Sequence, residues 1–291
     1  MQILKRNAGR LALLTAALIW GSSFIIMKGA VDDVPVFMLL AVRFSIAFML
    51  LGAIFIRKLL KADRQTLLGG MLCGMLLFGA YTSQTFGLMG TTPGKNAFLT
   101  AVYCVLVPFL SWVFFRKRPT VWNWVAAVMC VAGIGFVSLT GDLTIDPGDG
   151  LTLLGGLFYA FHIILLGRLG DRCDPIALTI VQFGSTAAFS WLFCLLAERG
   201  SAFPPAGIWP QLLYLAVLCT GLTILLQTVG QKLTPPSQAA ILMSLESVFG
   251  VFFSLLMGAE TLTLPLVCGF ALIFCSVIIS ETQLSFLRKK S

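Results

Sequence analysis

Long apolar runs follow one another along the chain, separated by short polar or proline-containing segments. Each run has about the 20 residues that a helix needs to cross the hydrocarbon core of a bilayer. The pattern predicts ten membrane-spanning helices, over residues 9–29, 35–56, 67–88, 94–115, 120–140, 150–169, 175–197, 209–231, 236–258 and 263–283. The predicted fold is therefore an all-α integral membrane protein.

The segments between the runs contain helix breakers at the expected ends of the helices. Proline is tolerated in the first turn of a helix, because its missing N–H has no intrahelical partner there. Prolines stand at six predicted starts: Pro35, Pro93, Pro119, Pro175, Pro210 and Pro265. The segment from Asp146 to Gly150 predicts a turn in the middle of the chain. Gly70 and Gly74 match a motif for close helix packing.

Composition supports a lipid environment. Hydrophobic residues make up 58% of the 291 residues and charged residues 11%, with a mean hydropathy of +0.95. A soluble domain has about 45–50% apolar and about 25% charged residues. These values exclude a soluble globular enzyme, a disordered chain and a coiled coil.

The charged residues predict the orientation of the chain. Sixteen Lys and Arg residues fall in loops on one side of the predicted bilayer, and three, Lys28, Lys95 and Arg199, fall on the other. Seven acidic residues accompany these three: Asp32, Asp33, Asp142, Asp146, Asp149, Glu198 and Glu260. Because basic loops stay in the cytoplasm, both termini are expected to be cytoplasmic. The net charge of +8 is then a topology signal, and no nucleic-acid partner is expected.

Cysteine and histidine indicate neither disulfides nor a metal site. Seven of the eight cysteines lie inside apolar runs, without C-x-x-C spacing, so free thiols are predicted. A single histidine excludes a zinc site built from several histidines. No metal and no cofactor are expected.

The two halves of the chain resemble each other. Trp20–Ile26 aligns with Tyr159–Leu165 at an offset of 139, and Gln84-Thr85 aligns with Gln227-Thr228 at an offset of 143. The Pro35 and Pro93 segments repeat at 140 and 142. Five helices in each half place the second repeat upside down in the membrane, a design of secondary transporters. We predict a first repeat over residues 1–141 and a second, inverted one over residues 142–291.

Five short motifs stand along the whole chain: Trp20-Gly-Ser-Ser-Phe24, Pro35 with Arg43, Ala97–Tyr103 with Val107-Pro108, Leu245-Glu-Ser247 and Gly258-Ala-Glu260. In these motifs the chain resembles EamA-type members of the drug/metabolite transporter superfamily. Family members often have proline after the glutamate, where this chain has Ser247. The resemblance implies a carrier of ten helices for small polar or amphipathic metabolites, which within the family include amino acids, nucleotide-related compounds and drugs.

Polar residues share faces on several predicted helices, and such residues usually point into the bundle. Tyr81 and Gln84 are three apart, as are Tyr159 and His162, and Asn96 and Tyr103 are seven apart. With Gln227, Trp20 and Glu246, they form the predicted substrate site. The alternative is that these groups only join helices by interhelical hydrogen bonds, and for His162 we favour a hydrogen-bonded core position.

Two charges lie well inside predicted helices, Arg43 and Glu246. They could neutralise each other as an ion pair, or each could bind backbone carbonyls at a helix end. Alternatively, Glu246 could carry protons or anchor a cation, and Arg43 could hold a carboxylate or phosphate.

No Walker loop, G-x-S-x-G or H-E-x-x-H motif occurs. We therefore predict a non-enzymatic secondary transporter in the cytoplasmic membrane, an exporter or exchanger of metabolites such as amino acids, amines or drug-like solutes. Protons are a candidate coupling ion, and the expected assembly is a monomer or homodimer. The alternative function is a membrane-embedded enzyme or a lipid-handling scaffold.

Overall fold

The computed structural model describes residues 2–138, 146–170, 172–200, 202–234 and 236–283. Side chains are described throughout these ranges except at residues 2–6, 170, 228–229, 231–232 and 236–241. The described residues form helices and loops, with no strand among them. The all-α prediction is confirmed.

The first half contains α1 (Gln2–Asp33), α2 (Val36–Ile54), α3 (Ile56–Leu59), α4 (Arg64–Met89), α5 (Pro93–Thr100), α6 (Tyr103–Phe115) and α7 (Val121–Ser138). The second half contains α8 (Pro147–Gly170), α9 (Pro175–Ala197), η1 (Ala206–Ile208), α10 (Trp209–Leu213), η2 (Tyr214–Leu222), α11 (Thr223–Leu233), α12 (Pro236–Leu256) and α13 (Leu264–Thr282). Within the described residues, nine helices are long and apolar enough to cross a membrane, and α12 adds a shorter apolar stretch, Leu242–Leu256.

Two of the predicted helices are not regular. The helix expected over residues 94–115 is divided into α5 and α6, because i→i−3 hydrogen bonds at Val102, Cys104 and Val105 tighten the chain between them. The helix expected over residues 209–231 contains a π-helical segment, η2, which widens its middle. Apolar patterning does not reveal either departure.

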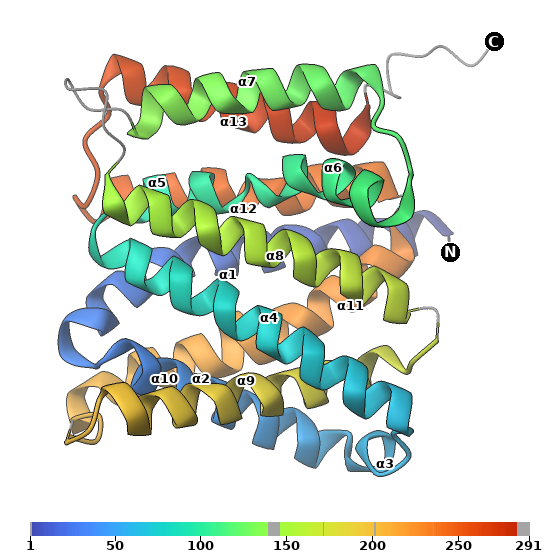
Figure 1. Ribbon diagram of the computed structural model, residues 1–291, viewed down its shortest axis with the longest axis vertical. Helices are drawn as coiled ribbons and strands as arrows, with labels where there is room; N and C mark the ends of the chain where they lie inside the picture. Colours follow the sequence, from blue (N-terminus) through green and yellow to red (C-terminus); the bar gives the residue numbers. More distant parts are fainter. Residues whose placement is uncertain (1, 139–145, 171, 201, 235, 284–291) are drawn as a thin grey trace.

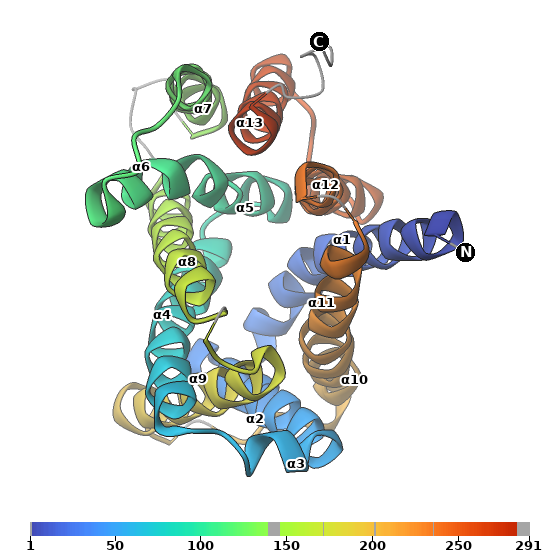
Figure 2. The ribbon, with the colours of Figure 1, turned by 90° about the vertical axis from the view of Figure 1, so that its right-hand side faces the viewer.

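The helices are arranged with an approximate two-fold symmetry between the halves. In Figure 1, α1 and α8 run across the bundle in opposite directions. Helix α4 packs against α8, and the equivalent elements of the other half, α11 and η2, pack against α1. Helices α2 and α9 form a pair at one edge of the bundle, and α7 and α13 form a pair at the other (Figures 1 and 2). This arrangement is an inverted repeat of five helices, and the predicted boundary at residues 141–142 lies outside the described residues.

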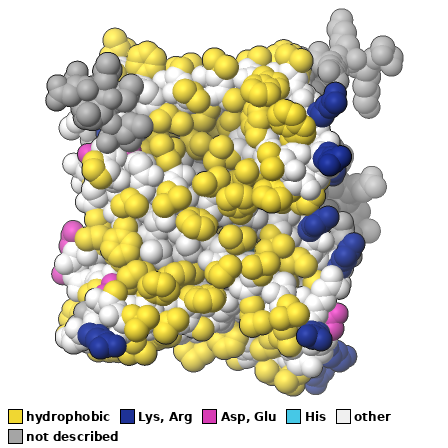
Figure 3. Space-filling view, in the orientation of Figure 1, with side chains coloured by type: hydrophobic (Ala, Val, Ile, Leu, Met, Phe, Trp, Pro, Cys, Tyr) yellow, Lys and Arg dark blue, Asp and Glu magenta, His cyan; other side chains and the backbone are white. Residues whose placement is uncertain are grey.

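The two ends of the bundle differ in charge. We call the end that carries Arg57, Lys58, Arg64, Arg116 and Arg168 the basic end, and in Figure 3 most of the lysine and arginine side chains lie along that edge. We call the opposite end, which carries Asp32, Asp33, Asp149, Glu198 and Glu260, the acidic end. Asp142 and the basic residues Arg288, Lys289 and Lys290 lie outside the described residues.

Charged side chains at the acidic end bind helix termini. The Lys28 ammonium donates to the carbonyls of Leu88 (2.7 Å), Met89 (3.0 Å) and Thr91 (3.1 Å), where α4 ends. The Glu198 carboxylate accepts from the first backbone N–H groups of α2, at 2.9 Å. Such contacts satisfy groups that have no intrahelical partner and match the helix dipole.

A second set of contacts at the acidic end involves the start of α5. Thr92 donates its hydroxyl to the Glu260 carboxylate at 2.6 Å. Lys95 lies 3.7 Å from Asp149, a carboxylate with no exposed surface. Together with Lys28, these contacts fasten α1, α4, α5, α8 and the segment after α12 to one another at this end.

Two predictions about the interior of the bundle are confirmed, the close helix packing at Gly70 and Gly74 and the free cysteine thiols. A Cβ atom at Gly70 would lie 2.6 Å from Val181, and one at Gly74 would lie 2.5 Å from the backbone oxygen of Gln182, so both glycines allow α4 to approach α9 closely. All eight cysteines are free thiols, as predicted.

Candidate functional site

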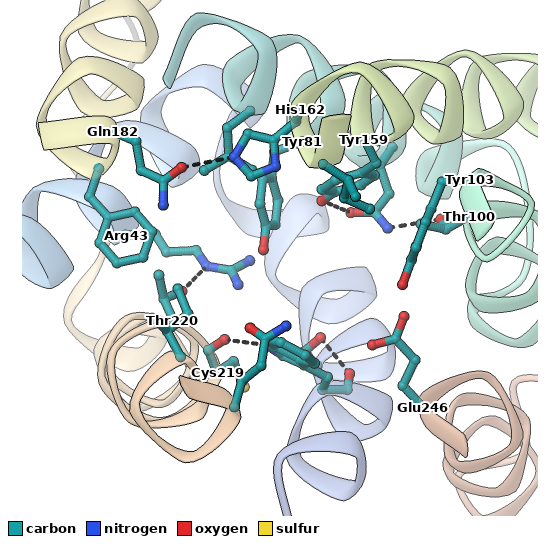
Figure 4. A pocket seen from close by; sticks show the side chains of 18 of the residues that line it. Arg43, Tyr81, Thr100, Tyr103, Tyr159, His162, Gln182, Cys219, Thr220 and Glu246 are labelled. Atoms are coloured by element: carbon teal, nitrogen blue, oxygen red, sulfur yellow. Dashed lines mark hydrogen bonds between the residues drawn. The ribbon is translucent and has the colours of Figure 1, made fainter. Parts of the chain in front are cut away.

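A cavity of about 550 Å³ lies between the two halves. Its volume falls within the range of small-molecule sites. The nine residues predicted for a substrate site all line it, and Arg43 does too: Trp20, Arg43, Tyr81, Gln84, Asn96, Tyr103, Tyr159, His162, Gln227 and Glu246. Figure 4 shows most of these side chains converging from different helices.

The cavity is exposed toward the basic end. Lining residues near the acidic end are almost fully buried: Asn96 has 0% exposed surface and Leu88 has 1%. Toward the basic end, Ile163 is 37% exposed, and Pro175, the first residue of α9, is also exposed. The contacts of Lys28, Lys95 and Glu260 lie beyond the buried part. The exposed lining residues therefore lie toward the basic end, and the contacts of Lys28, Lys95 and Glu260 close the acidic end.

The lining residues form pairs related by the internal repeat. The offset of 139 relates Trp20 to Tyr159 and Phe24 to Ile163, and all four line the cavity. The offset of 143 relates residues of α4 to residues of η2 and α11 in the same way: Leu77 to Thr220, Tyr81 to Ile224, and Gln84 to Gln227. The cavity therefore lies on the two-fold axis, where equivalent surfaces of the repeats meet.

Amide and hydroxyl groups on one wall form a connected network. Gln84 donates its side-chain amide to Thr100 at 2.9 Å and accepts from the Tyr159 hydroxyl at 3.1 Å. Asn96 donates to Thr152 at 2.8 Å and to the backbone oxygen of Gln84 at 3.1 Å, and its own side-chain oxygen has no partner in the described structure. Gln84, Asn96, Thr100 and Tyr159 join α4, α5 and α8 and also line the cavity. They therefore both link helices by hydrogen bonds and form part of the candidate site.

His162 is a buried residue with a hydrogen-bonded partner. It is 8% exposed, and its Nε2 lies 2.8 Å from the side-chain oxygen of Gln182 on α9. This is the core position that we favoured from the sequence, although the same imidazole also lines the cavity.

Arg43 and Glu246 do not form the ion pair that was one prediction. The described residues contain two salt bridges, Lys58–Asp174 and Lys95–Asp149, and neither involves Arg43 or Glu246. Among the described residues, no backbone carbonyl accepts a hydrogen bond from Arg43, and its Nε donates instead to the Thr220 hydroxyl at 2.9 Å. The two charges come from α2 and α12, which stand on different sides of the cavity (Figures 2 and 4).

Two side chains of the cavity, Arg43 and Trp20, donate hydrogen bonds to the π-helical segment η2. A π-turn shifts backbone hydrogen bonds and often occurs at functional sites. Within η2, Thr220 donates to the carbonyl of Leu215, five residues earlier, at 2.8 Å, while it accepts from Arg43. The carbonyl of Cys219 accepts from the Trp20 indole at 2.8 Å. The departure from α-helical geometry therefore positions Arg43 and Trp20.

The lining also includes polar or sulfur-containing residues outside the predicted site, among them Met27, Thr179, Gln182, Cys219, Thr220 and Met243. Thr179 and Gln182 are three apart on α9, so they carry the same facial signal as Tyr81 and Gln84.

The sequence matches the EamA-like transporter family over residues 7–139 and again over residues 146–282. The chain belongs to this family. The family resemblance inferred from the short motifs is confirmed, and the double match agrees with the two repeats.

Several relatives are transporters by name. An uncharacterized transporter of Archaeoglobus fulgidus is 33% identical over 94% of this chain and 86% of its own length. The uncharacterized inner membrane transporter YedA of Escherichia coli is 24% identical over 87% of this chain and 83% of its own length. A protein of known crystal structure has a TM-score of 0.67 and 19% identity, and the match covers 97% of this chain and 99% of that one, which supports the fold.

The position after Glu246 differs from the pattern that we expected from family members. Ser247 allows α12 to continue without interruption from Pro236 to Leu256, and its hydroxyl donates to the Ala97 carbonyl on α5 at 3.4 Å. The equivalent place in the first half is the break between α5 and α6, directly before Tyr103. Glu246 therefore lies inside an unbroken helix, whereas Tyr103 is the first residue of a new helix after the break.

Proposed function

We propose that this protein is a secondary carrier in the cytoplasmic membrane, an exporter or exchanger of small metabolites such as amino acids, amines or drug-like solutes. It would work by alternating access, with the two five-helix repeats moving around the central cavity. No covalent chemistry is part of this proposal.

The observation that carries the proposal is a central cavity that both repeats line at equivalent positions and whose exposed lining residues lie toward one end. Such a cavity is what alternating access requires, because an inverted repeat can exchange the conformations of its halves and so open at the other end. The aromatic side chains would pack the apolar part of a solute, and the amides of Gln84, Asn96 and Gln227 would bind its polar groups.

The loop charges support an orientation with both termini in the cytoplasm. The described conformation would then be open to the cytoplasm, ready to receive a solute for export or exchange. Glu246 lines the cavity without an ionic partner in the described structure, so we propose it as the carrier of a coupled proton.

Reconstitution into liposomes tests this function. A metabolite panel is offered with and without an imposed pH gradient, and solute-dependent flux is expected for at least one member. Absence of flux across a broad panel would contradict the carrier. If flux ignores both the gradient and the substitution Glu246→Gln, proton coupling is wrong, and Asp33→Asn at the exposed acidic end is the matched control. A reporter fused after Ser291 is expected to give a cytoplasmic signal.

A further inference from the structure

A second cavity lies between α4 and α8, close to the basic end. It has a volume of about 540 Å³ and shares no lining residue with the central cavity. We call it the α4–α8 groove. Both repeats contribute to its lining, which consists of Arg64, Gln65, Leu68, Gly69, Leu72, Leu165 and Leu169.

The walls of the groove are apolar. Leu68 and Leu72 on α4 are 52% and 45% exposed, and Leu165 and Leu169 on α8 are half-buried. A Cβ atom at Gly69 would lie 2.7 Å from the end of the Leu169 side chain, so the missing side chain leaves the space between the two helices. Figure 3 shows hydrophobic side chains over this face of the bundle. Because hydrocarbon surrounds a membrane-spanning bundle, an acyl chain fits these walls.

One end of the groove carries a cation. Arg64 is the first residue of α4 and is exposed, and no carboxylate of the described residues lies within 4.0 Å of its guanidinium. The neighbouring carboxylate, Asp63, accepts instead from the backbone N–H of Thr66 at 2.8 Å. A guanidinium binds a phosphate through two parallel hydrogen bonds, and the amide of Gln65 lies in the same lining.

The cation stands at the depth where lipid headgroups lie. Arg64 begins the membrane-spanning stretch of α4, and the four leucines of the groove follow toward the interior of the bilayer. Basic pockets between membrane helices bind anionic headgroups. A phosphate at the guanidinium with an acyl chain below it therefore matches both parts of the groove.

A second copy of the chain fits the groove less well. Two copies that share one orientation in the membrane would bring their basic ends together, and like charges repel. An anionic lipid instead brings the charge that this end attracts.

We propose that the α4–α8 groove binds one phospholipid with an anionic headgroup, its phosphate held by Arg64 and one acyl chain lying along the four leucines. The inference is independent of the proposed transport function, since the groove is separate from the central cavity. Because α4 and α8 belong to different repeats, the bound lipid would contact both of them and stabilise the bundle.

Lipid titration of the purified full-length protein in detergent tests the proposal. The probes are palmitoyl-oleoyl phosphatidylglycerol and palmitoyl-oleoyl phosphatidylcholine, which have the same chains and differ in headgroup charge. Glycerol phosphate is the third probe and has no chain. Native mass spectrometry counts the bound lipids and the protein chains, and thermal stabilisation measures the affinity.

Phosphatidylglycerol is expected to bind about fivefold or more tightly than phosphatidylcholine. Arg64→Gln is expected to remove this preference, and Arg64→Lys, which keeps the charge but loses the planar fork, is expected to retain part of it. Arg57→Gln removes an exposed arginine of the same end that lies outside the groove, and it should leave the preference unchanged.

The acyl chain is tested by a second pair of variants. Gly69→Ala places a methyl group in the groove and is expected to weaken the binding of both lipids. Gly167→Ala is the matched control on α8, because nothing lies within 4 Å of its added Cβ.

Three results would overturn the inference. One is equal binding of the two lipids, or an equal loss of preference in Arg64→Gln and Arg57→Gln, which would reduce the effect to the general charge of the basic end. Another is glycerol phosphate binding as tightly as phosphatidylglycerol, which would indicate a site for small anions. The third is a dimer without bound lipid that Leu68→Ser separates into monomers, which would assign the groove to a second copy of the chain.

Discussion

The Lys28 ammonium is the contact at the acidic end for which the consequence of removal can be worked out most directly. It binds three carbonyls where α4 ends, at 2.7, 3.0 and 3.1 Å, and so joins α1 to α4 beyond the buried part of the cavity. Lys28→Met keeps the apolar stem of the side chain and removes the charge and the three donors. If the cavity is to open at this end, these bonds have to break.

The expected size of the effect follows from the number of bonds that are shielded from water. A hydrogen bond to a charged group contributes about 1.5–3 kcal/mol. Two of the three bonds are partly buried, and the bond to Met89 is exposed and counts for little. Because water binds the freed carbonyls in the variant, we expect a loss of about 2–3 kcal/mol, which is about 30- to 150-fold in the ratio of closed to open states.

Hydrogen–deuterium exchange of the purified protein measures this ratio directly. Amides in the last turn of α4, near Leu88, are expected to exchange faster in Lys28→Met, by up to the same factor, while amides at the basic end are unchanged. Lys28→Arg keeps the charge and is expected to stay close to the wild type.

The matched control is Lys58→Met. Lys58 bonds Asp174 at 2.9 Å at the basic end, and both side chains are more than 40% exposed, so this pair contributes less than about 1 kcal/mol. Exchange near Leu88 should not respond to its loss. If Lys28→Met and Lys58→Met give the same exchange near Leu88, the acidic end is not held closed by Lys28 and the reasoning is wrong.

Three further predictions concern other contacts. Burial raises the pKa of Glu260 above its ordinary value, against the opposing hydrogen bond from Thr92 and the charge of Lys95. The protonated carboxyl of Glu260 therefore stabilises the closed acidic end more than the ionised one does. Hydrogen–deuterium exchange at the start of α5, corrected for its intrinsic pH dependence, should rise as the pH rises through that pKa. No such rise is expected in Glu260→Gln. Gly74→Ala should lower thermal stability by about 1–3 kcal/mol, because its Cβ would meet the backbone of α9, whereas Gly150→Ala, with open space around the new Cβ, should not lower it. Trp20→Phe should cost about 1 kcal/mol of stability in the same measurement, since the carbonyl of Cys219 keeps a second donor, Thr223.

The positions of the helices and the composition of the site were predictable from the sequence. Membrane-spanning helices need long apolar runs, and polar residues in such runs are costly unless they face the interior. Both are local properties of the chain. Tyr81 and Gln84, spaced three apart, were therefore predictable as lining residues, and so were Tyr159 and His162, which have the same spacing.

The tertiary structure alone decided how these residues meet. Arg43 and Glu246 are 203 positions apart, and periodicity within each helix does not tell whether α2 and α12 bring their charges together. The structure places them apart, each without an ionic partner in the described residues. The π-helical turn at Thr220 was also invisible in the sequence, because an apolar run looks the same in an α-helix and in a π-helix. The hydrogen bonds that Trp20 and Arg43 donate to Cys219 and Thr220 come from other helices and were not predictable either. Helical spacing determines which face a residue occupies, but the packing of distant helices determines what that face meets.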